Sequence, residues 1–281
     1  MKKFFSIMSL MLVLVLVSAS FAACASNGNS DETTVATDAA TTNAASSSED
    51  TSAPETKYTT LKMGTNAAFP PYEYKEGEEF KGIDVELAEA IAAKLGKKLV
   101  IEDVPFGSIV SGVNTGKYDI GMAGLTVTDE RKLEVNFSKS YATGVQVVIV
   151  KENSAIKSLD DLAGANVMIG VQQDTTGHFY ASDTPEKGGY GEDHVIPYTN
   201  GAAAVAALVA DKVQAVIIDN EPAKAYVAAN EGLTILEAKW LTEDYAIAIN
   251  KADTQLLADI DAALDALIAD GTVQRIIDKF F

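Results

Sequence analysis

Residues 118–131 read YDIGMAGLTVTDER, a pattern that indicates a buried strand, a Gly/Thr turn and the start of a helix. Apolar side chains give the strand a hydrophobic body, and Gly124 lets a ligand approach the backbone closely. Thr126 and Thr128 can cap the helix, and Arg131 lies one turn inside it. Backbone N–H groups at a helix start, hydroxyls and a guanidinium together suit a small planar anion, a carboxylate. The alternative is a capped surface helix with a solvated arginine.

Helices and strands alternate on both sides of this stretch. Residues 82–96 predict a helix, because apolar side chains recur at every fourth position, Asp84 can cap the start and Gly96 follows the last turn. A long amphipathic helix is expected between Asp253 and Gly271. The other expected elements are strand 98–103, helix 108–115, strand 118–124, helix 128–135, strand 165–171, helix 176–182, strand 194–198, helix 200–210, strand 213–219, a helix opened by Pro222 and strand 233–238. This alternation predicts an α/β fold, in which parallel sheets carry helices on both faces.

Polar and aromatic residues follow several of these strands at their carboxyl ends. They are Phe106, Gly124, Thr126, residues 172–176 and Asp219. Parallel α/β sheets bind ligands just outside the carboxyl ends of their strands. Five unrelated surface positions would not be expected to coincide in this way, so the pattern favours a binding site.

The start of the chain has the features of a secretory signal over residues 1–23. Lys2 and Lys3 precede an apolar run from Phe4 to Val17, and small residues then lead to Cys24. The apolar run is short for a bilayer span, and no later segment is apolar for long enough. An exported protein is therefore expected, and not an integral membrane protein.

The sequence FAAC, residues 21–24, resembles a bacterial lipobox, in which the cysteine is lipidated and becomes the new N-terminus. Cys24 is the only cysteine of the chain, so it has no intramolecular disulfide partner. Phe21 stands where such motifs usually carry an aliphatic residue, and simple cleavage after Ala23 is the alternative. Residues 24–57 are too polar to fold and predict a tether, or plain low-complexity filler. A lipid anchor would hold the protein at the extracytoplasmic face of the cell membrane, in the periplasm if the host has an outer membrane.

Composition limits the classes of function. The formal net charge is −18, and removal of the leader takes away two lysines and no acid. This charge argues against nucleic acid, because phosphate binding needs clustered Lys and Arg. With 2 histidines and 1 cysteine there is no metal-ligand spacing, and no cofactor is expected. Residues 112–117 imitate a phosphate-binding loop, but Tyr118 stands where Ser or Thr must bind magnesium.

Seven pieces of the chain, taken in order, resemble one known family. They are GTNAAFPPYEY (64–74), FKGIDVELAEAIAAKLG (80–96), FGSIVSGVNTGKYDIGMAGLTVTDERK (106–132), VNFSKSY (135–141), IGVQQDTTG (169–177), VQAVIIDNEPA (213–223) and YAIAINKADTQLLADIDAALDALIADGTVQRIIDKFF (245–281). From about Lys57 to Phe281 the chain is similar to the polar amino acid-binding proteins of bacterial ABC importers, the family 3 solute-binding proteins.

The resemblance implies a two-lobed periplasmic-binding-protein-like fold of type II. Each lobe is then a mostly parallel sheet flanked by helices, and two crossing strands, near residues 146–151 and 243–246, join the lobes. Lobe one is expected at residues 58–148 plus 246–281, and lobe two at 149–245. The lobes would close over the ligand by a hinge motion.

The resemblance also implies roles for residues at the two ends of an amino acid. Arg131, with Thr126 and Gly124, resembles the clamp for the α-carboxylate. Asp219 resembles the partner of the α-ammonium, and a helix or turn cap is the alternative for this residue. Thr175 resembles a donor from lobe two.

The remaining implied roles concern the ligand side chain and the loop of lobe two. Phe69 and Phe106 resemble aromatic lids, although either could be plain core. Thr176 resembles a second carboxylate donor from lobe two, where Asp174 replaces the more usual Gly. The complete set of expected ligand-binding residues is Asn66, Phe69, Phe106, Ala123, Gly124, Thr126, Arg131, Gln172, Thr175, Thr176 and Asp219.

The expectation about ligand specificity rests on Asn66. Family members that take cationic side chains often have an acid at this position, because a buried cation needs a counter-charge. Asn supplies only dipoles, so a neutral polar amino acid such as glutamine is favoured. Glu73 or another acid could still serve a basic ligand.

Three classes of function follow from the resemblance. The first is a monomeric, non-catalytic protein that captures a free amino acid and delivers it to an ABC permease in the membrane. The second is an enzyme on the same scaffold, such as a dehydratase of small carboxylic acids, with His178 or Glu221 as the nearby acid or base. The third is a signalling or adhesive surface lipoprotein.

Overall fold

The computed structural model describes residues 59–236 and 240–281, which belong to one compact unit. The expected leader, Cys24 and the tether lie outside the described residues. Within the part of the chain that is described, no helix combines the length and apolar character needed to cross a membrane.

The first sheet has five strands in the order β5-β1-β6-β14-β7. The strand β1 pairs in parallel with both β5 and β6, whereas β14 runs antiparallel to β6 and β7. The bounds are β1 (Thr60–Thr65), β5 (Lys98–Asp103), β6 (Ile120–Gly121), β7 (Val135–Phe137) and β14 (Ala248–Asn250). A small sheet of β2 (Ala68–Phe69), β3 (Glu73–Glu76) and β4 (Glu79–Lys81) belongs to the same lobe, which is called lobe one below.

The second sheet repeats this order as β10-β9-β11-β8-β12. Here β9 pairs in parallel with β10 and β11. The strand β8 lies between β11 and β12 and runs antiparallel to both. The bounds are β8 (Ala142–Lys151), β9 (Ile169–Gln172), β10 (Val195–Tyr198), β11 (Ala215–Asp219) and β12 (Leu233–Ile235). The body built on this sheet is called lobe two. The two-lobed α/β fold of type II is thus confirmed, with one antiparallel strand inserted in each sheet.

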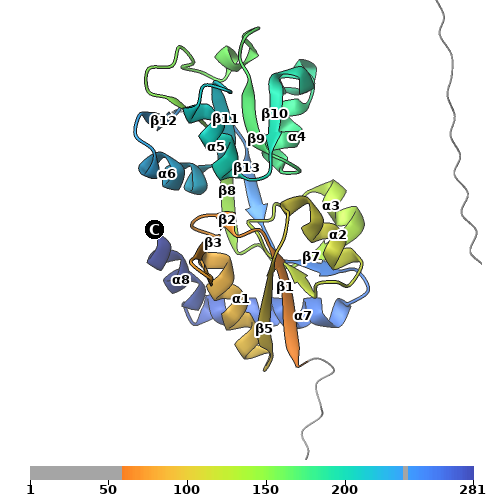
Figure 1. Ribbon diagram of the computed structural model, residues 1–281. Coiled ribbons are helices and arrows are strands. Elements are labelled where there is room, and N and C mark those ends of the chain that lie inside the picture. Colours follow the sequence, from red (N-terminus) through yellow and green to blue (C-terminus); the bar gives the residue numbers. More distant parts are fainter. Residues whose placement is uncertain (1–58, 237–239) are drawn as a thin grey trace, which may run out of the picture. The chain divides into compact units, whose positions relative to one another are not determined.

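Two strands cross between the lobes, β8 and β13 (Thr242–Tyr245), and they pair antiparallel (Figure 1). Residues 142–145 of β8 face β13, whereas residues 146–151 pair with β11 and β12 in the second sheet. The first crossing therefore comes a few residues before the expected position at 146–151, because that later segment is already a central strand of lobe two.

Helices cover the sheets on both faces (Figure 1). They are α1 (Ile83–Lys94), α2 (Ile109–Asn114), α3 (Asp129–Glu134), α4 (Thr176–Ser182), α5 (Gly201–Val209), α6 (Asn220–Ala229), α7 (Thr254–Ala269) and α8 (Thr272–Phe280), with 3-10 turns at Phe106–Ser108, Asp160–Ala163, Pro185–Lys187 and Glu192–His194. Two predicted caps are confirmed. Thr128 accepts a hydrogen bond from the Arg131 backbone N–H (3.1 Å), and Asp253 accepts one from that of Leu256 (3.1 Å).

The predicted cap of α1 by Asp84 is wrong. Gly82 is the N-cap residue and makes no side-chain capping bond. Asp84 is completely buried, and its carboxylate reaches into lobe one. The sequence pattern could not distinguish these roles, because an acid in a first helical turn fits both.

The expected strand 118–124 is shortened to the two residues of β6. Gly124 has φ +51°, a left-handed conformation that turns the chain out of the sheet. The following residues return to the crossing strand, where Thr126 forms an isolated bridge with Tyr245. The turn therefore lies directly at the junction of the two lobes.

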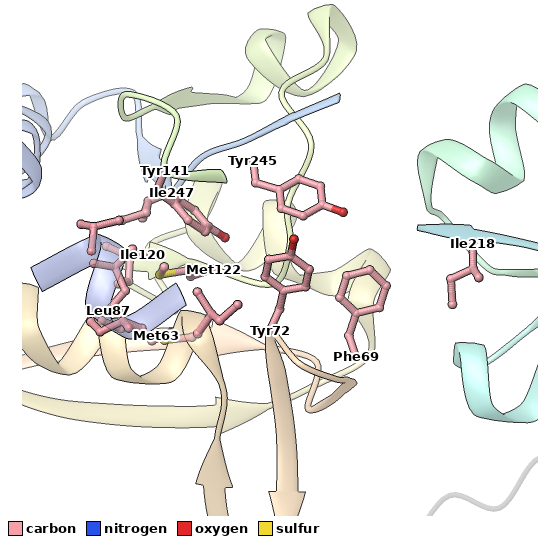
Figure 2. Close-up of a cluster of buried hydrophobic side chains, with 14 of the residues drawn as sticks. Met63, Phe69, Tyr72, Leu87, Ile120, Met122, Tyr141, Ile218, Tyr245 and Ile247 are labelled. Atoms are coloured by element: carbon pink, nitrogen blue, oxygen red, sulfur yellow. The ribbon is translucent and has the colours of Figure 1, made fainter. Parts of the chain in front are cut away.

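A cluster of buried side chains supports this junction, and Figure 2 shows part of it. The ring of Tyr72 stacks on Phe69 at 5.8 Å between centroids and meets Tyr245 edge-on at 5.2 Å. In the view of Figure 2, these three rings lie on the side of the cluster nearest Ile218 of β11. Aromatic contacts of this kind hold the backbone of lobe one against the crossing strand.

Candidate functional site

One pocket is lined by residues of both lobes. All eleven residues expected at a ligand site line it, and four more join them. The complete lining is Asn66, Phe69, Glu73, Phe106, Ala123, Gly124, Thr126, Arg131, Gln146, Gln172, Thr175, Thr176, Ile217, Ile218 and Asp219.

The topology explains why residues so distant in sequence meet here. Asn66 directly follows β1, Ala123 and Gly124 follow β6, Gln172 ends β9 and Asp219 ends β11. These positions are carboxyl ends of parallel strands, where α/β sheets place their ligands. Strand order therefore brings these residues together at one pocket.

Asp84 fixes the turn that follows β6. Its Oδ2 accepts hydrogen bonds from the Gly124 backbone N–H and from the Tyr141 hydroxyl, both at 2.8 Å. Burial raises the pKa of Asp84 to about 6, and these two hydrogen bonds oppose the rise. A Cβ atom on Gly124 would lie 2.7 Å from the ring of Phe69, so this position has no room for a side chain.

Arg131 presents its guanidinium to the pocket from the first turn of α3. One nitrogen donates to the carbonyl oxygen of Thr126 (2.8 Å) and the other to that of Asp174 in lobe two (3.3 Å). The guanidinium carbon lies 5.3 Å from the ring centroid of Phe106. Burial lowers the pKa of Arg131, and the charge of Glu243 opposes this effect. Arg131 forms no ion pair with a carboxylate of the described residues.

Asp219 lies at the end of β11 and is only 9% exposed. One carboxylate oxygen accepts from the hydroxyl of Tyr245, and the other accepts from the side-chain amide of Gln146 at 3.0 Å. Burial, and then the charge of Glu243, raise the pKa of Asp219 to about 7. The alternative role as a helix cap is not realised, because Asp219 precedes α6 without a side-chain capping bond.

The three threonines of the pocket all use their hydroxyl groups within the protein. Thr175 caps α4, accepting from the His178 backbone N–H (3.2 Å) and donating to the Gln172 carbonyl (2.8 Å). Thr126 and Thr176 donate to one oxygen of Glu243, at 3.2 and 3.0 Å. Sequence reasoning placed Glu243 on the returning strand and did not connect it with the site.

Asp174 adopts φ +64°, a backbone conformation that Gly adopts without strain. This finding explains why Gly is the more usual residue at this position of the loop. The loop register follows from the bonds around it, because the Asp174 backbone N–H donates to the ring of His178 at 3.2 Å.

Asn66 is occupied at both ends of its side-chain amide. Its nitrogen donates to the carbonyl oxygen of Val104 (2.8 Å), and its oxygen accepts from the side chain of Gln172 (3.0 Å). Asn66 therefore joins the lobes and keeps one N–H and one oxygen lone pair for other partners.

Glu73 is a buried acid of the pocket whose carboxyl group lies beside that of Asp84. It is 0% exposed, and neither carboxyl oxygen has a fixed hydrogen-bond donor. Burial first, and then the charge of Asp84, hold the pKa of Glu73 well above its usual range. Glu73 and Asp84 hydrogen-bond each other when one of them carries a proton, since two ionised carboxylates have no donor.

The two residues considered as catalytic acids or bases do not line this pocket. His178 uses its ring in the loop around Asp174, and Glu221 forms an ion pair with Lys224 at 2.7 Å. Among the described residues, no group of three or more His, Cys, Asp or Glu could hold a metal ion.

Sequence and structure comparisons give a consistent set of relatives. The arginine-binding extracellular protein ArtP of Bacillus subtilis is 34% identical over 226 residues, which cover 79% of this chain and 86% of the relative. An ancestral arginine-binding protein, solved with glutamine and with arginine, has a TM-score of 0.73 and 37% identity, covering 79% of this chain and 98% of the solved one.

A further solved relative bears on the question of catalysis. The ancestral amino acid-binding protein AncCDT-1, described as a precursor of cyclohexadienyl dehydratase, has a TM-score of 0.72 and 32% identity over 79% of this chain and 96% of its own. The family model of bacterial extracellular solute-binding proteins, family 3, matches residues 61–281. The chain therefore belongs to the bacterial extracellular solute-binding proteins, family 3.

Proposed function

We propose that this protein is the substrate-binding component of an ABC importer, which captures one free amino acid between its lobes and delivers it to a membrane permease. The proposal rests on two residues of opposite charge that line the pocket, Arg131 of lobe one and Asp219 of lobe two. Asp219 is buried and Arg131 is partly buried, and neither has an ion-pair partner among the described residues. The carboxylate and ammonium of a free amino acid supply the two missing charges.

We infer that lobe closure completes the site. Residues of lobe one and of lobe two line the pocket together. Side chains bridge them in the ligand-free protein, with Gln172 bound to Asn66 at 3.0 Å and the Tyr226 hydroxyl bound to the Ala68 carbonyl at 2.7 Å. A hinge in the paired residues of β8 and β13 would allow these contacts to open and close.

For the ligand side chain, a basic amino acid such as arginine is the first candidate. The expectation of a neutral ligand rested on Asn66, whose amide is already occupied at both ends. Glu73 offers a buried carboxyl with no fixed donor, and a guanidinium supplies both the donors and the counter-charge. Several relatives are named for arginine. A neutral amide such as glutamine is the second candidate, because one solved relative was obtained with either amino acid.

We propose binding, and not turnover, as the activity. Each acid of the pocket has a role in binding, since Asp219 suits the α-ammonium and Glu73 suits a cationic side chain. The dehydratase alternative needs a group that transfers a proton at the reacting atom, and His178 and Glu221 are engaged elsewhere. Recovery of a chemically altered amino acid at catalytic amounts of protein would establish the enzyme instead.

The experiment that tests the proposal is titration calorimetry of the chain without its leader against arginine, lysine, glutamine and glycine. We expect one ligand per protein, with arginine bound most tightly. Asp219→Asn should weaken every amino acid, whereas Glu73→Gln should weaken arginine and lysine selectively. A protein that binds none of these ligands, or binds them equally well without the charges of Arg131 and Asp219, would contradict the proposal.

We also propose that lipid at Cys24 anchors the mature protein to the extracytoplasmic face of the membrane. The FAAC sequence and the single cysteine support it. Cys24→Ser should move the protein from the membrane fraction to the soluble fraction of its native host, with Ser26→Ala as the neighbouring control. A wild-type protein that fractionates as soluble would exclude the anchor.

A further inference from the structure

The hydroxyl groups of Thr126 and Thr176 have one proton each, and both protons are directed to Glu243. Thr126 donates to Glu243 Oε2 at 3.2 Å and Thr176 donates to the same oxygen at 3.0 Å. A hydroxyl has a single O–H and cannot donate to two acceptors at full strength. While these bonds persist, neither hydroxyl is available to the carboxylate of a ligand.

Glu243 is built into the junction and is not a surface acid that happens to lie nearby. It is 5% exposed and lies on the crossing strand β13, opposite Gly144 of β8. The amide of Gln146 donates a third hydrogen bond to Oε2 at 2.9 Å, while Oε1 is buried without a partner. A carboxylate held by several fixed donors at a buried site is well defined in position.

The donors around Glu243 come from both lobes and from the crossing strand. Thr126 follows β6 of lobe one, and Thr176 opens α4 of lobe two. Both threonines also line the pocket beside Arg131, the cation proposed for the ligand carboxylate. The Glu243 side chain therefore takes from the pocket the two hydroxyl donors that an α-carboxylate would share with Arg131.

We propose that Glu243 is an internal competitor for the carboxylate-binding donors, which lowers the affinity for amino acids and favours their release. This inference rests on the proposed function, because it assumes a ligand with an α-carboxylate. An arriving carboxylate meets a second negative charge and finds the threonine hydroxyls in use, so Arg131 carries most of its binding. Glu243 thereby adjusts how tightly the closed protein holds its cargo.

A purely structural role for Glu243 predicts the opposite result. If the residue only held the two threonines in place, its loss would misplace donors that the ligand uses, and binding would weaken. In the competitor role, its loss frees the hydroxyls and binding strengthens. The sign of the change in affinity therefore decides between the two roles.

The test is a double-mutant cycle with Glu243→Met and Thr126→Val, read by calorimetry with the tightest amino acid. Glu243→Met removes both acceptor oxygens at similar length and should tighten binding about tenfold, the gain expected from one or two recovered hydrogen bonds. Thr126→Val should weaken binding less in the wild-type background than in the Glu243→Met background, where the loss should be at least fivefold. Asp244→Asn is the matched control, because it removes one exposed acid from the same strand.

The carboxylate of the ligand provides a second readout that a structural role would not produce. The gain from Glu243→Met should be present for arginine and absent for its decarboxylated analogue, agmatine. Glu243→Gln keeps one acceptor oxygen and should give an intermediate gain, which serves if the Met variant does not show a wild-type melting transition. Weaker arginine binding by a folded Glu243 variant, or an equal cost of Thr126→Val in both backgrounds, would overturn the inference. A wild-type protein without amino acid binding would instead refute the proposed function itself.

Discussion

At the scale of single residues, the pocket is defined by charges that lack partners. Arg131 is partly buried and Glu73 is completely buried, and neither forms an ion pair among the described residues. Burial of such groups costs free energy in the ligand-free protein, and a ligand of complementary charge recovers it. The pocket therefore selects ligands by the charges that it leaves unpaired.

Arg131→Ala should reduce amino acid affinity by about 2–5 kcal/mol, on the order of thirtyfold or more, because the ligand carboxylate would be buried without its cation. Arg131→Lys should recover only part of the loss, since an ammonium cannot form the two-pronged contact of a guanidinium. Calorimetry measures both variants. The exposed Arg275→Ala is the control, and an Arg131→Ala variant that binds as well as this control would remove Arg131 from the site.

Glu73 should couple the binding of a cation to release of a proton. Its pKa is held well above the usual range, so the carboxyl keeps its proton to higher pH than an exposed glutamate does. A guanidinium favours the ionised form, and the proton leaves. Near pH 6, the binding of arginine should release up to one more proton than the binding of glutamine. Asp219, with a pKa of about 7, loses its proton with either ligand, so its contribution cancels in this comparison.

Calorimetry in two buffers of different ionisation enthalpy measures this difference. Glu73→Gln should abolish it and should reduce arginine affinity more than glutamine affinity. Equal proton release for both ligands in the wild-type protein would show that Glu73 does not meet the ligand side chain.

The same raised pKa values fix the sign of the pH dependence of stability. A carboxyl with a higher pKa in the folded state binds more protons when folded, so stability is lost as the pH rises from its unfolded pKa to its folded one. Asp84 and Asp219, with folded pKa values of about 6 and about 7, act in this direction together with Glu73. The melting temperature of the ligand-free protein should fall between about pH 4 and pH 7. Glu73→Gln should reduce that fall, and a melting temperature that rises over this range would contradict the assignment.

At the scale of elements, the features that the sequence predicted well depend on contacts between residues close together in the chain. Thr128 and Asp253 cap helices through bonds to residues three positions away, which a sequence pattern can reveal. The residues grouped around the pocket follow from strand order, which alternating elements predict. Glu243 and Asp84 differ, because their partners are 117 and 40 positions away from them and nothing in their own neighbourhood indicates those contacts.

Asp84→Ala should destabilise lobe one and weaken ligand binding together. The substitution leaves the buried Gly124 N–H and the Tyr141 hydroxyl without their acceptor, at a cost of about 1–3 kcal/mol for each unsatisfied group. Denaturant unfolding gives the change in stability, and calorimetry gives the affinity. Glu89→Ala, an exposed acid on the same helix, is the control. A variant of normal stability and affinity would show that Asp84 does not position the turn.

At the scale of the whole described unit, both sheets have the same strand order, and the two lobes are connected by the antiparallel pair of β8 and β13. Asn66 and Gln172 bridge the lobes within the pocket, whereas Tyr226 and Ala68 bridge them outside its lining. The outer bridge can therefore influence closure without touching a ligand.

Tyr226→Phe should lower the affinity for every amino acid by the same factor. The variant loses the 2.7 Å bond from the Tyr226 hydroxyl to the Ala68 carbonyl, which stabilises the closed state only. A net hydrogen bond contributes about 0.5–1.5 kcal/mol, so affinity should fall about two- to twelvefold for arginine and glutamine alike. Small-angle scattering should show a larger radius of gyration for the ligand-free variant, and saturating ligand should restore the wild-type value. Tyr74→Phe, which deletes a hydroxyl from β3 of lobe one, is the control; a selective loss for one amino acid would place Tyr226 at the ligand and refute its role in closure.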